Sequence, residues 1–546
     1  MNLFKFLVSD FISSNHKLVL KILLFTIITF TADFILAPKY LSSIINKLNT
    51  NNFKDINIVF YKLLLMYFIR IFFSHMLKLS ENVFYPKFVQ EIRGNLYSKI
   101  IEKYSEDYKD LKLGNIYSRI TNISTDFRHF LKIITTRIFP LFLINLFIAF
   151  LFLSYDRNLG LVMLISVISN LLVLNYFYPT ILQHRKITEG MFYDITDNMN
   201  NKFSNLMNIY INSQQKNEKT SINNDQIAYK EAYVKATNIQ IHLGTGMSII
   251  GTVGVFVIIF MFIKKMYNYK IDDESRIYLL FLLTFYLRNW FKLSRDIPLG
   301  LHFLGTVNAS QKFLKDILFF KSKNNHFEFK KNDIKFVNIN FGYDDNQPVI
   351  KNINLNIKSG EKIALIGRSG SGKSTLMKLL IRLYPYKGQI LIDDRDIKNI
   401  HIDSIRKQIS YINQKTHLND TSILNNIKYG NNVTDLEIKQ FLDKYDLNII
   451  FSKLKNGIHS NSGVNGNNLS LGMQKIIILM RGLLRSKESK IIIFDEPLAG
   501  LDIHTRDKVM KILKNLDKTK TIIIISHNKE ILPFVDRTID INKISK

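Results

Sequence analysis

Long apolar runs alternate with polar, periodic stretches in the part of the chain before residue 320. Six runs are long enough to cross a bilayer, which takes about 20 residues of helix: 18–44, 56–78, 133–154, 159–182, 242–264 and 276–301. The gaps after the second and fourth runs are long, polar and periodic, which is typical of helices that continue beyond the membrane. A large soluble helical bundle is the alternative. It fits poorly, because 141–153 is apolar nearly all round, with Asn145 its only polar side chain.

The pattern changes after a polar stretch at 321–326. From about residue 327, short Ile-rich runs alternate with helical stretches. The runs at 363–366, 491–494 and 521–525 are typical of strands buried in a parallel sheet. We therefore expect a multidomain chain, with an all-α membrane domain of six helices over 1–320 and an α/β domain over 327–546.

Composition adds little to this division. The formal net charge is +29, which can indicate a nucleic acid or an anionic membrane surface as partner, and there is no cysteine. Because the chain is rich in amino acids with A/T-rich codons and carries long apolar runs, we expect membrane lipid and no nucleic acid as partner. No cleavable signal peptide is evident, and the short segment 3–12 resembles an amphipathic helix at the membrane surface.

The most specific motif is a phosphate-binding loop. It fits G-x-x-x-x-G-K-[ST], follows an expected strand and opens an expected helix, which is the context that such a loop requires. Backbone N–H groups of its glycines and the helix N-terminus can surround the phosphates of ATP. Lys373 is expected to bridge two phosphates and Ser374 to bind Mg²⁺. The expected ATP-binding residues here are Gly367, Arg368, Ser369, Gly370, Ser371, Gly372, Lys373, Ser374 and Thr375.

Two acids end the apolar run at 491–494. Asp495 is expected to hold Mg²⁺, and Glu496 to polarise the attacking water as general base. A strand that ends in Asp-Glu is commonplace by itself. After a phosphate loop it indicates a P-loop NTPase.

Between these motifs lies Leu469-Ser470-Leu471-Gly472-Met473, which resembles the signature of the ABC transporter family, usually Leu-Ser-Gly-Gly-Gln. Residues 327–546 resemble the family's ATP-binding cassette in motif order and spacing. The resemblance implies that Ser470 and Gly472 contact ATP bound to a second cassette, since two cassettes of this family dimerise head to tail.

The resemblance also assigns roles to four single residues. Tyr343 matches the aromatic residue that stacks on adenine, and Asp502 matches the D-loop aspartate. Gln414 matches the glutamine that joins Mg²⁺ binding and catalysis, and His527 matches the catalytic switch histidine.

The signature departs from the family at Leu471 and Met473. In a homodimer both sites would carry this altered signature, which would slow turnover. In a heterodimer a partner's ordinary signature would complete one site. We favour a homodimer with a second copy of this half-transporter, and the heterodimer stays open.

The layout of the first domain resembles the exporter type of ABC membrane domain. Residues 114–121 resemble its first coupling loop, and 212–224, with Glu218, fit the second less closely. Short helices there would dock on the cassette near Gln414. The long second gap is rich in Lys and Arg, so the positive-inside tendency and the need to reach ATP place the cassette and both termini in the cytoplasm.

Three charges lie at similar depth inside the expected spans: Asp33, Arg70 and Arg288. A central charge is costly, so each is expected to face a partner or a wet cavity. Asp33 and Arg70 can form a structural pair. Arg288 would then be left to contact an anionic group on an unidentified cargo.

The sequence thus predicts an integral membrane ATPase, a half-transporter that dimerises and exports a hydrophobic, lipidic or peptide-like cargo. Alternatives are an importer on the same architecture, a weakly active regulatory subunit of a heterodimer, and a soluble ABC protein acting on nucleic acid. The apolar spans argue against the last.

Overall fold

The computed structural model describes residues 11–49, 53–106, 108, 113–266, 273–318, 320, 325–344, 347–413, 416–517 and 519–544. The chain forms two compact units, which are described separately. One comprises Met1–Ile100 and Leu111–Phe320, and the other comprises Ile101–Asp110 and Lys321–Lys546. The predicted interfacial segment 3–12 lies almost wholly outside the described residues.

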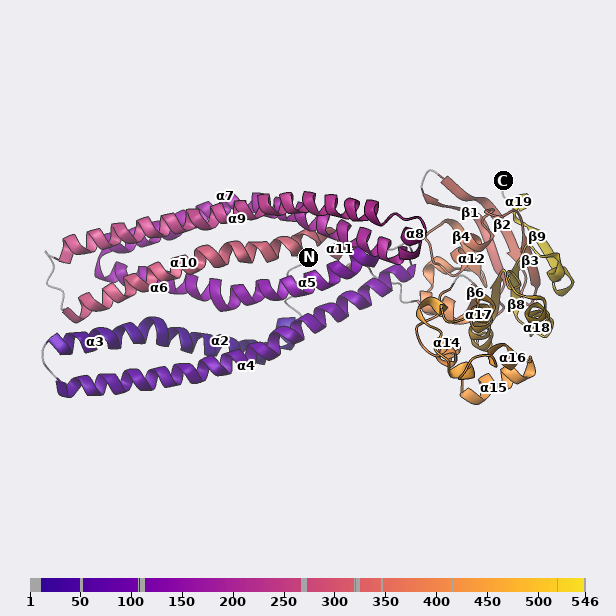
Figure 1. The fold of residues 1–546 in the computed structure, drawn as a ribbon, viewed down its shortest axis with the longest axis horizontal. Helices are drawn as coiled ribbons and strands as arrows, with labels where there is room; N and C mark the ends of the chain where they lie inside the picture. Colours follow the sequence, from indigo (N-terminus) through magenta and orange to yellow (C-terminus); the bar gives the residue numbers. More distant parts are fainter. Residues whose placement is uncertain are drawn as a thin grey trace. The chain divides into compact units, whose positions relative to one another are not determined.

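The first unit is all helical (Figure 1). Its elements are α2 (His16–Thr31), η1 (Ala32–Leu36), α3 (Ala37–Asn49), α4 (Phe53–Glu106, whose last turn belongs to the second unit), α5 (Leu113–Ile133), η2 (Ile134–Ile138), α6 (Phe139–Tyr155), α7 (Arg157–Ser204), α8 (Leu206–Ile211), α9 (Gln215–Met266), α10 (Asp273–Ala309) and α11 (Gln311–Leu318).

Five continuous helical stretches among the described residues are long and apolar enough to cross a membrane. They are His16–Asn49, Lys54–Glu106, Gly114–Tyr155, Arg157–Ser204 and Gln215–Lys264. The sixth predicted span, 276–301, lies within α10, which is continuous but is not among these five. It carries several charged side chains, among them Arg288, Lys292 and Arg295. Its crossing of the bilayer stays a prediction.

Two of the helical stretches contain a π-helical turn, η1 and η2. Each ends two residues before a proline, Pro38 or Pro140. Proline has no N–H to donate and its ring crowds the carbonyl four residues earlier, so the hydrogen-bond ladder must shift locally. The two wide turns therefore follow from the sequence.

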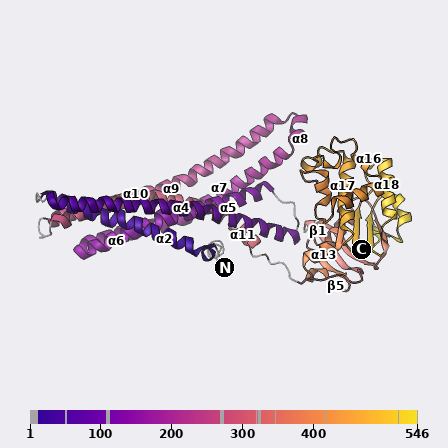
Figure 2. The ribbon, with the colours of Figure 1, turned by 90° about the horizontal axis from the view of Figure 1, so that it is seen from below.

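One hydrophobic core of this unit is built by α6, α7, α9 and α10, and α7 and α9 run side by side (Figures 1 and 2). Asn145, the lone polar side chain of its apolar run, is buried and accepts a hydrogen bond of 3.3 Å from Asn289 on α10. The packing explains why an amide is tolerated in an otherwise apolar helix.

The second unit is an α/β domain with two sheets. Its strands are β1 (Ile334–Asp344), β2 (Gln347–Ile357), β3 (Lys362–Ile366), β4 (Lys387–Ile392), β5 (Arg395–Asp396), β6 (Ile409–Asn413), β7 (Ile491–Asp495), β8 (Thr521–Ile525) and β9 (Arg537–Asp540). The antiparallel sheet has the order β2-β1-β4-β5. The parallel sheet has the order β6-β7-β8-β3-β9.

Helices accompany the parallel sheet, with α16, α17 and α18 gathered on one side of the domain in Figure 2. They are α12 (Lys373–Leu380), α13 (Ile402–Gln408), α14 (Ile423–Lys428), α15 (Asp435–Lys444), α16 (Asn448–Phe451), α17 (Leu471–Arg485), α18 (Ile503–Lys514) and α19 (Ile541–Ile544). Short 3-10 turns are η3 (Ile397–Asn399), η4 (Gly457–His459), η5 (Val464–Gly466) and η6 (Lys529–Phe534).

The three Ile-rich runs form strands of the parallel sheet, as the sequence predicts. Every residue of β7 and β8 is buried, which is why these strands are apolar along their whole length rather than on alternate residues. The carboxyl ends of β3, β6, β7 and β8 therefore meet at one edge, where the loops that follow them can form a common site.

Candidate functional site

The phosphate loop connects β3 to α12. Gly372 caps α12 with φ 90°, and Gly370 has φ 78°, a left-handed conformation that glycine adopts without steric cost. The ammonium of Lys373 donates to the carbonyls of Gly367 and Arg368 at 3.0 and 2.9 Å. Burial lowers the pKa of Lys373, and the charges of Glu496 and Asp495 oppose this shift. The loop thus holds its lysine at the N-terminus of a helix, where phosphates bind best.

Asp495 ends β7 and is 8% exposed. Each of its two carboxylate oxygens accepts a hydrogen bond. Ser374 Oγ donates to Oδ1 at 2.8 Å, and Tyr411 Oη donates to Oδ2 at 2.7 Å. The sequence predicted the first of these neighbours. Tyr411, on β6, was not foreseen.

Glu496 and His527 follow the neighbouring strands β7 and β8. The Nε2 atom of His527 lies 3.4 Å from Oε1 of Glu496, and both side chains are partly exposed. The backbone N–H of Glu496 donates to the carbonyl of Ile525 at 2.9 Å. The predicted base and the predicted switch histidine are therefore brought together.

Tyr343 lies beside the phosphate loop on β1, and about half of its surface is exposed. Its hydroxyl is 3.0 Å from Thr375 Oγ1, and its ring meets those of Phe341 and Tyr384 edge-on, at centroid distances of 5.0 and 5.4 Å. Because the Tyr343 ring is about half exposed and contacts its aromatic neighbours edge-on, adenine can stack on a free face of the ring.

Ser470 and Asp502 are helix caps in this chain. Ser470 Oγ accepts from the N–H of Met473 at 3.3 Å at the start of α17. Asp502 accepts from the N–H of Thr505 at 2.9 Å at the start of α18, and this bond lowers its pKa. Leu471 is 60% exposed. Gln414 lies outside the described residues.

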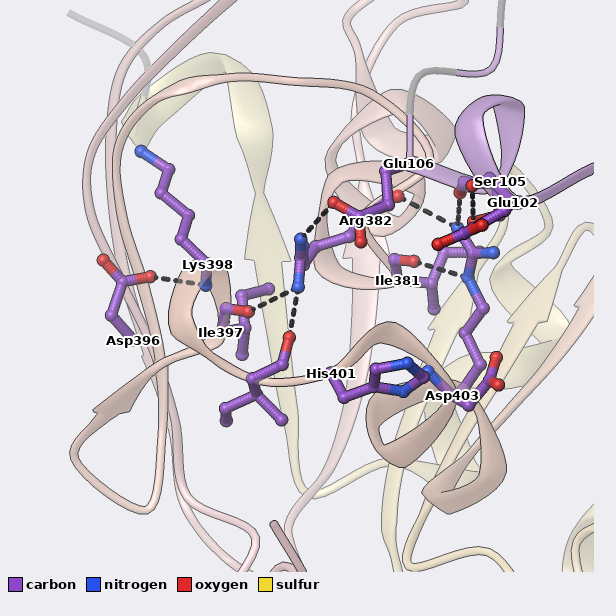
Figure 3. Close-up of polar contacts among 12 residues, drawn as sticks. Glu102, Ser105, Glu106, Ile381, Arg382, Asp396, Ile397, Lys398, His401 and Asp403 are labelled. Carbon is purple, nitrogen blue, oxygen red and sulfur yellow. Dashed lines mark hydrogen bonds and ion pairs between the residues drawn. The ribbon is translucent and has the colours of Figure 1, made fainter. Parts of the chain in front are cut away.

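The second unit includes the end of α4 and the residues that follow it, Ile101–Asp110. Figure 3 shows its helical turn with Glu106 directed towards Arg382 of the cassette. Arg382 Nη2 donates to Glu106 Oε2 at 2.8 Å, while its Nη1 donates to the carbonyls of Ile397, at 3.0 Å, and Ile400. Both side chains of the Glu106–Arg382 pair are largely buried.

The second arginine, Arg406, donates to the carbonyl of Ser105 and, at 3.0 Å, to that of Ile381. Burial and the charge of Arg382 lower the pKa of Arg406 to about 10, so it keeps its charge at neutral pH. Beyond Glu106, the N–H of Tyr108 donates to the carbonyl of Leu383 at 2.7 Å, and its ring meets Tyr384 at 6.2 Å.

Residues 114–121, the predicted first coupling loop, lie inside α5 in the first unit, whereas the preceding segment, 101–110, belongs to the second unit with the cassette. Docking of 114–121 on the cassette stays a prediction. Both segments lie in the same long polar gap of the sequence. The hydrophobic periodicity of that gap does not change where α4 ends. Arg382 and Arg406 carry no motif, so only the structure identifies them.

In the first unit, Arg70 binds Asp33 through two hydrogen bonds of 3.0 and 2.9 Å. The predicted structural pair is confirmed. Arg288 is exposed, and no described residue forms an ion pair with it. Tyr286 and Trp290, near Arg288 in the sequence, are buried in the core of the unit.

The site defines a class of protein: a nucleotide-binding cassette fused to a helical membrane domain. Known proteins agree with this description. The ABC transporter family model matches residues 350–499. ATP-dependent lipid A-core flippase 2 of Colwellia psychrerythraea is 39% identical over 215 residues, 39% of this chain and 36% of that protein.

Two further comparisons extend over both units. A putative export ATP-binding/permease protein of Rickettsia bellii is 28% identical over 473 residues, 84% of this chain and 80% of its own length. The structure of a bacterial Atm1-family ABC exporter with ATP bound has a TM-score of 0.85 at 18% identity, over 96% of this chain and 94% of that one.

The first curated relatives align mainly through the cassette, and the chain spans about a third of their length. The fold, however, matches from end to end. The chain joins an integral membrane domain to one cassette, whose residues 350–499 match the ABC transporter family model.

Proposed function

We propose that this chain is one half of an ATP-driven exporter. Its cassette would bind and hydrolyse ATP, and its helical unit would move a hydrophobic, lipidic or peptide-like cargo across a membrane. The observation that carries the proposal is the meeting of Lys373, Ser374, Asp495, Glu496 and His527 at one edge of the parallel sheet. The described part of the same chain holds five apolar helices of membrane-spanning length.

The donor set suits Mg²⁺. Ser374 Oγ and Asp495 Oδ1 offer a hydroxyl and a carboxylate oxygen 2.8 Å apart, and Mg²⁺ prefers oxygen ligands. Gln414 is a further ligand by resemblance to the family. When bound, the ion would neutralise charge that develops on the phosphates.

The residues of the chain divide the chemistry between them. Lys373 and the N–H groups of its loop would hold the β- and γ-phosphates, and the Tyr343 ring would stack on adenine. Glu496 would accept the proton of the attacking water. His527, 3.4 Å from Glu496, would orient that water and contact the γ-phosphate.

A second half-transporter would complete each site. Ser470 stands at the N-terminus of the fifteen-residue helix α17, where N–H groups and the helix dipole favour an anion. In the dimer that we propose, this end would face ATP bound to the partner's phosphate loop. A homodimer is the simpler assembly. In it, Leu471 would slow ATP hydrolysis at both sites.

Coupling would run through residues 101–110. Helix α12 has Lys373 at its N-terminus, and its C-terminal end is tied to Ser105 and Glu106 by Arg406 and Arg382. A displacement of the phosphate loop along α12 would therefore reach the chain that leads into the membrane unit. The predicted second loop at 212–224 stays a further candidate.

Export is the favoured direction, because the relatives are named for export or flipping. Curated relatives are named for different cargoes, iron-sulfur clusters in one and lipid A-core in another, so neither cargo is carried over to this chain. Exposed Arg288 supports an anionic group on the cargo. The cassette and both termini would lie in the cytoplasm, where ATP is available.

The decisive experiment is to purify the whole chain alone, reconstitute it in liposomes and measure ATPase activity. We expect Mg²⁺-dependent hydrolysis that Lys373→Ala abolishes, and ATP-driven movement of cargo in inside-out vesicles only. A protein that carbonate extracts from membranes would overturn the proposal. So would a chain that binds no ATP.

A further inference from the structure

Asp495 has two hydrogen-bond donors, and only one of them belongs to a recognised motif. Ser374 Oγ occupies Oδ1, on the side where Mg²⁺ is expected, and Tyr411 Oη occupies Oδ2 at 2.7 Å. The carboxylate is 8% exposed. A buried carboxylate that lacks a donor is costly, so both contacts matter to its state.

The sheet places Tyr411 for this contact. Strands β6 and β7 are parallel, with Tyr411 beside Ile493 and Asn413 beside Asp495. Ile493 and Asp495 share one face because side chains alternate along a strand. The long side chain of Tyr411 therefore extends along that face to a carboxylate two residues further on, while its ring packs against the core of the domain.

We propose that Tyr411 is a positioning residue for the metal site. Its hydroxyl fixes the rotation of the Asp495 carboxylate, so that Oδ1 stays directed at Ser374 Oγ. The hydrogen bond is charge-assisted, and such bonds are shorter and stronger than neutral ones. Groups that orient metal ligands in this way typically raise metal affinity by about 10- to 100-fold.

This role rests on the proposed ATP and Mg²⁺ chemistry, but it adds a residue to which no motif assigns a function. It also predicts that metal affinity and metal-free nucleotide binding respond differently to a change at Tyr411. Because the hydroxyl of Tyr411 binds a metal ligand, its loss should act on metal affinity and leave metal-free nucleotide binding unchanged.

The test uses Tyr411→Phe in the full chain, reconstituted in liposomes. Mn²⁺ replaces Mg²⁺ as the probe, and its binding is followed by electron paramagnetic resonance with a non-hydrolysable ATP analogue. We expect the affinity for Mn²⁺ to fall about tenfold, with analogue binding in EDTA unchanged. The Mg²⁺ concentration for half-maximal ATPase should rise in parallel.

Two controls keep the outcome specific. Tyr445→Phe removes the hydroxyl of another buried tyrosine of the cassette and should leave Mn²⁺ affinity unchanged. In an Asp495→Asn background, Tyr411→Phe should add little to the loss, since both changes act on one carboxylate.

Equal Mn²⁺ affinity in the wild type and in Tyr411→Phe would overturn the inference while the proposed function stands. So would an equal loss of metal-free analogue binding, which indicates a merely structural role. A wild-type chain that binds the analogue but no Mn²⁺ would overturn the proposed metal chemistry itself.

Discussion

Glu496 has a backbone φ of 56°, in a left-handed region that residues other than glycine rarely adopt. The bond from its N–H to the carbonyl of Ile525 holds this conformation. The turn takes the side chain out of line with β7 and towards His527. Strain of this kind is characteristic of functional positions, and it separates the role of Glu496 from that of the preceding aspartate.

Replacing Glu496 with Gln should stop hydrolysis and spare ATP binding. The amide keeps the shape of the side chain but cannot accept the proton of the attacking water, so ATPase activity should fall at least about 100-fold. Activity and nucleotide affinity are measured on the same reconstituted protein. Asp495→Asn serves as the contrasting variant, because it should weaken Mg²⁺ binding. A Glu496→Gln chain with near-normal ATPase would exclude Glu496 as the base.

The residues of the site differ in how far sequence could identify them. The phosphate loop is contiguous, and its chemistry depends on backbone N–H groups, so its motif alone predicts it. Tyr411 and Arg382 act through contacts with residues distant in the chain, Asp495 and Glu106. Their types are ordinary for a strand and a helix end, and the pattern of the sequence offers no signal for them.

At the scale of elements, α17 begins with a departure from the family pattern. Leu471 is its first residue and is 60% exposed, so its side chain contributes little to the core. A would-be Cβ at Gly472 meets nothing within 4 Å. The side chain of Leu471 is therefore free to meet whatever faces this end of the helix.

Leu471→Gly should raise ATPase activity several-fold if the chain acts as a homodimer. Glycine near a helix start costs up to about 1 kcal/mol, and the substitution removes the bulk that would face the partner's ATP. Leu471→Ala is the matched control, which keeps a Cβ and should give a smaller gain. No gain from either variant would indicate that Leu471 does not limit turnover, as expected where another subunit supplies the signature.

The end of α4 is the second element with a functional consequence. The helix continues without a break to Glu106, and α5 begins at Leu113, so the segment that belongs with the cassette, 101–110, precedes the one that sequence resemblance selected. The sequence predicts the long helices well, because their apolar runs are long. It predicts the ends of these helices poorly, because the helical hydrophobic periodicity continues through the polar stretches beyond the membrane.

Glu106→Gln should uncouple hydrolysis from transport. The change removes the charge of a largely buried ion pair but leaves Arg382 bonded to two carbonyls, so the cassette should stay folded. We expect basal ATPase activity within about twofold of the wild type and a clear loss of cargo-stimulated activity and transport. Glu361→Gln, which breaks an ion pair with Arg537 elsewhere on the cassette, should preserve coupling. Equal transport in both variants would argue against this route.

At the scale of the whole molecule, the charged side chains of the membrane unit differ in how its packing accounts for them. Asp33 and Arg70 bind each other through two hydrogen bonds, which satisfies both. Phe34, next to Asp33, meets Phe285 on α10 at a centroid distance of 5.7 Å, so the pair and Arg288 lie on neighbouring elements. Lys292 and Arg295 follow Arg288 at spacings of four and seven residues, which places all three on one face of α10.

Arg288→Gln should spare basal ATPase activity and abolish its stimulation by acidic amphiphiles. The guanidinium is exposed and does not contribute to the core, so its loss should not disturb the cassette, but an anionic cargo would lose its counter-charge within the membrane unit. Stimulation is measured in liposomes across a panel of lipids and peptides that differ only in headgroup or terminal charge.

Arg276→Gln, at the start of α10 and paired with Asp273, is the matched control and should respond like the wild type. Unchanged stimulation of Arg288→Gln by every acidic member of the panel would remove Arg288 from the cargo site. A loss that extends equally to neutral amphiphiles would assign it to coupling rather than to recognition of charge.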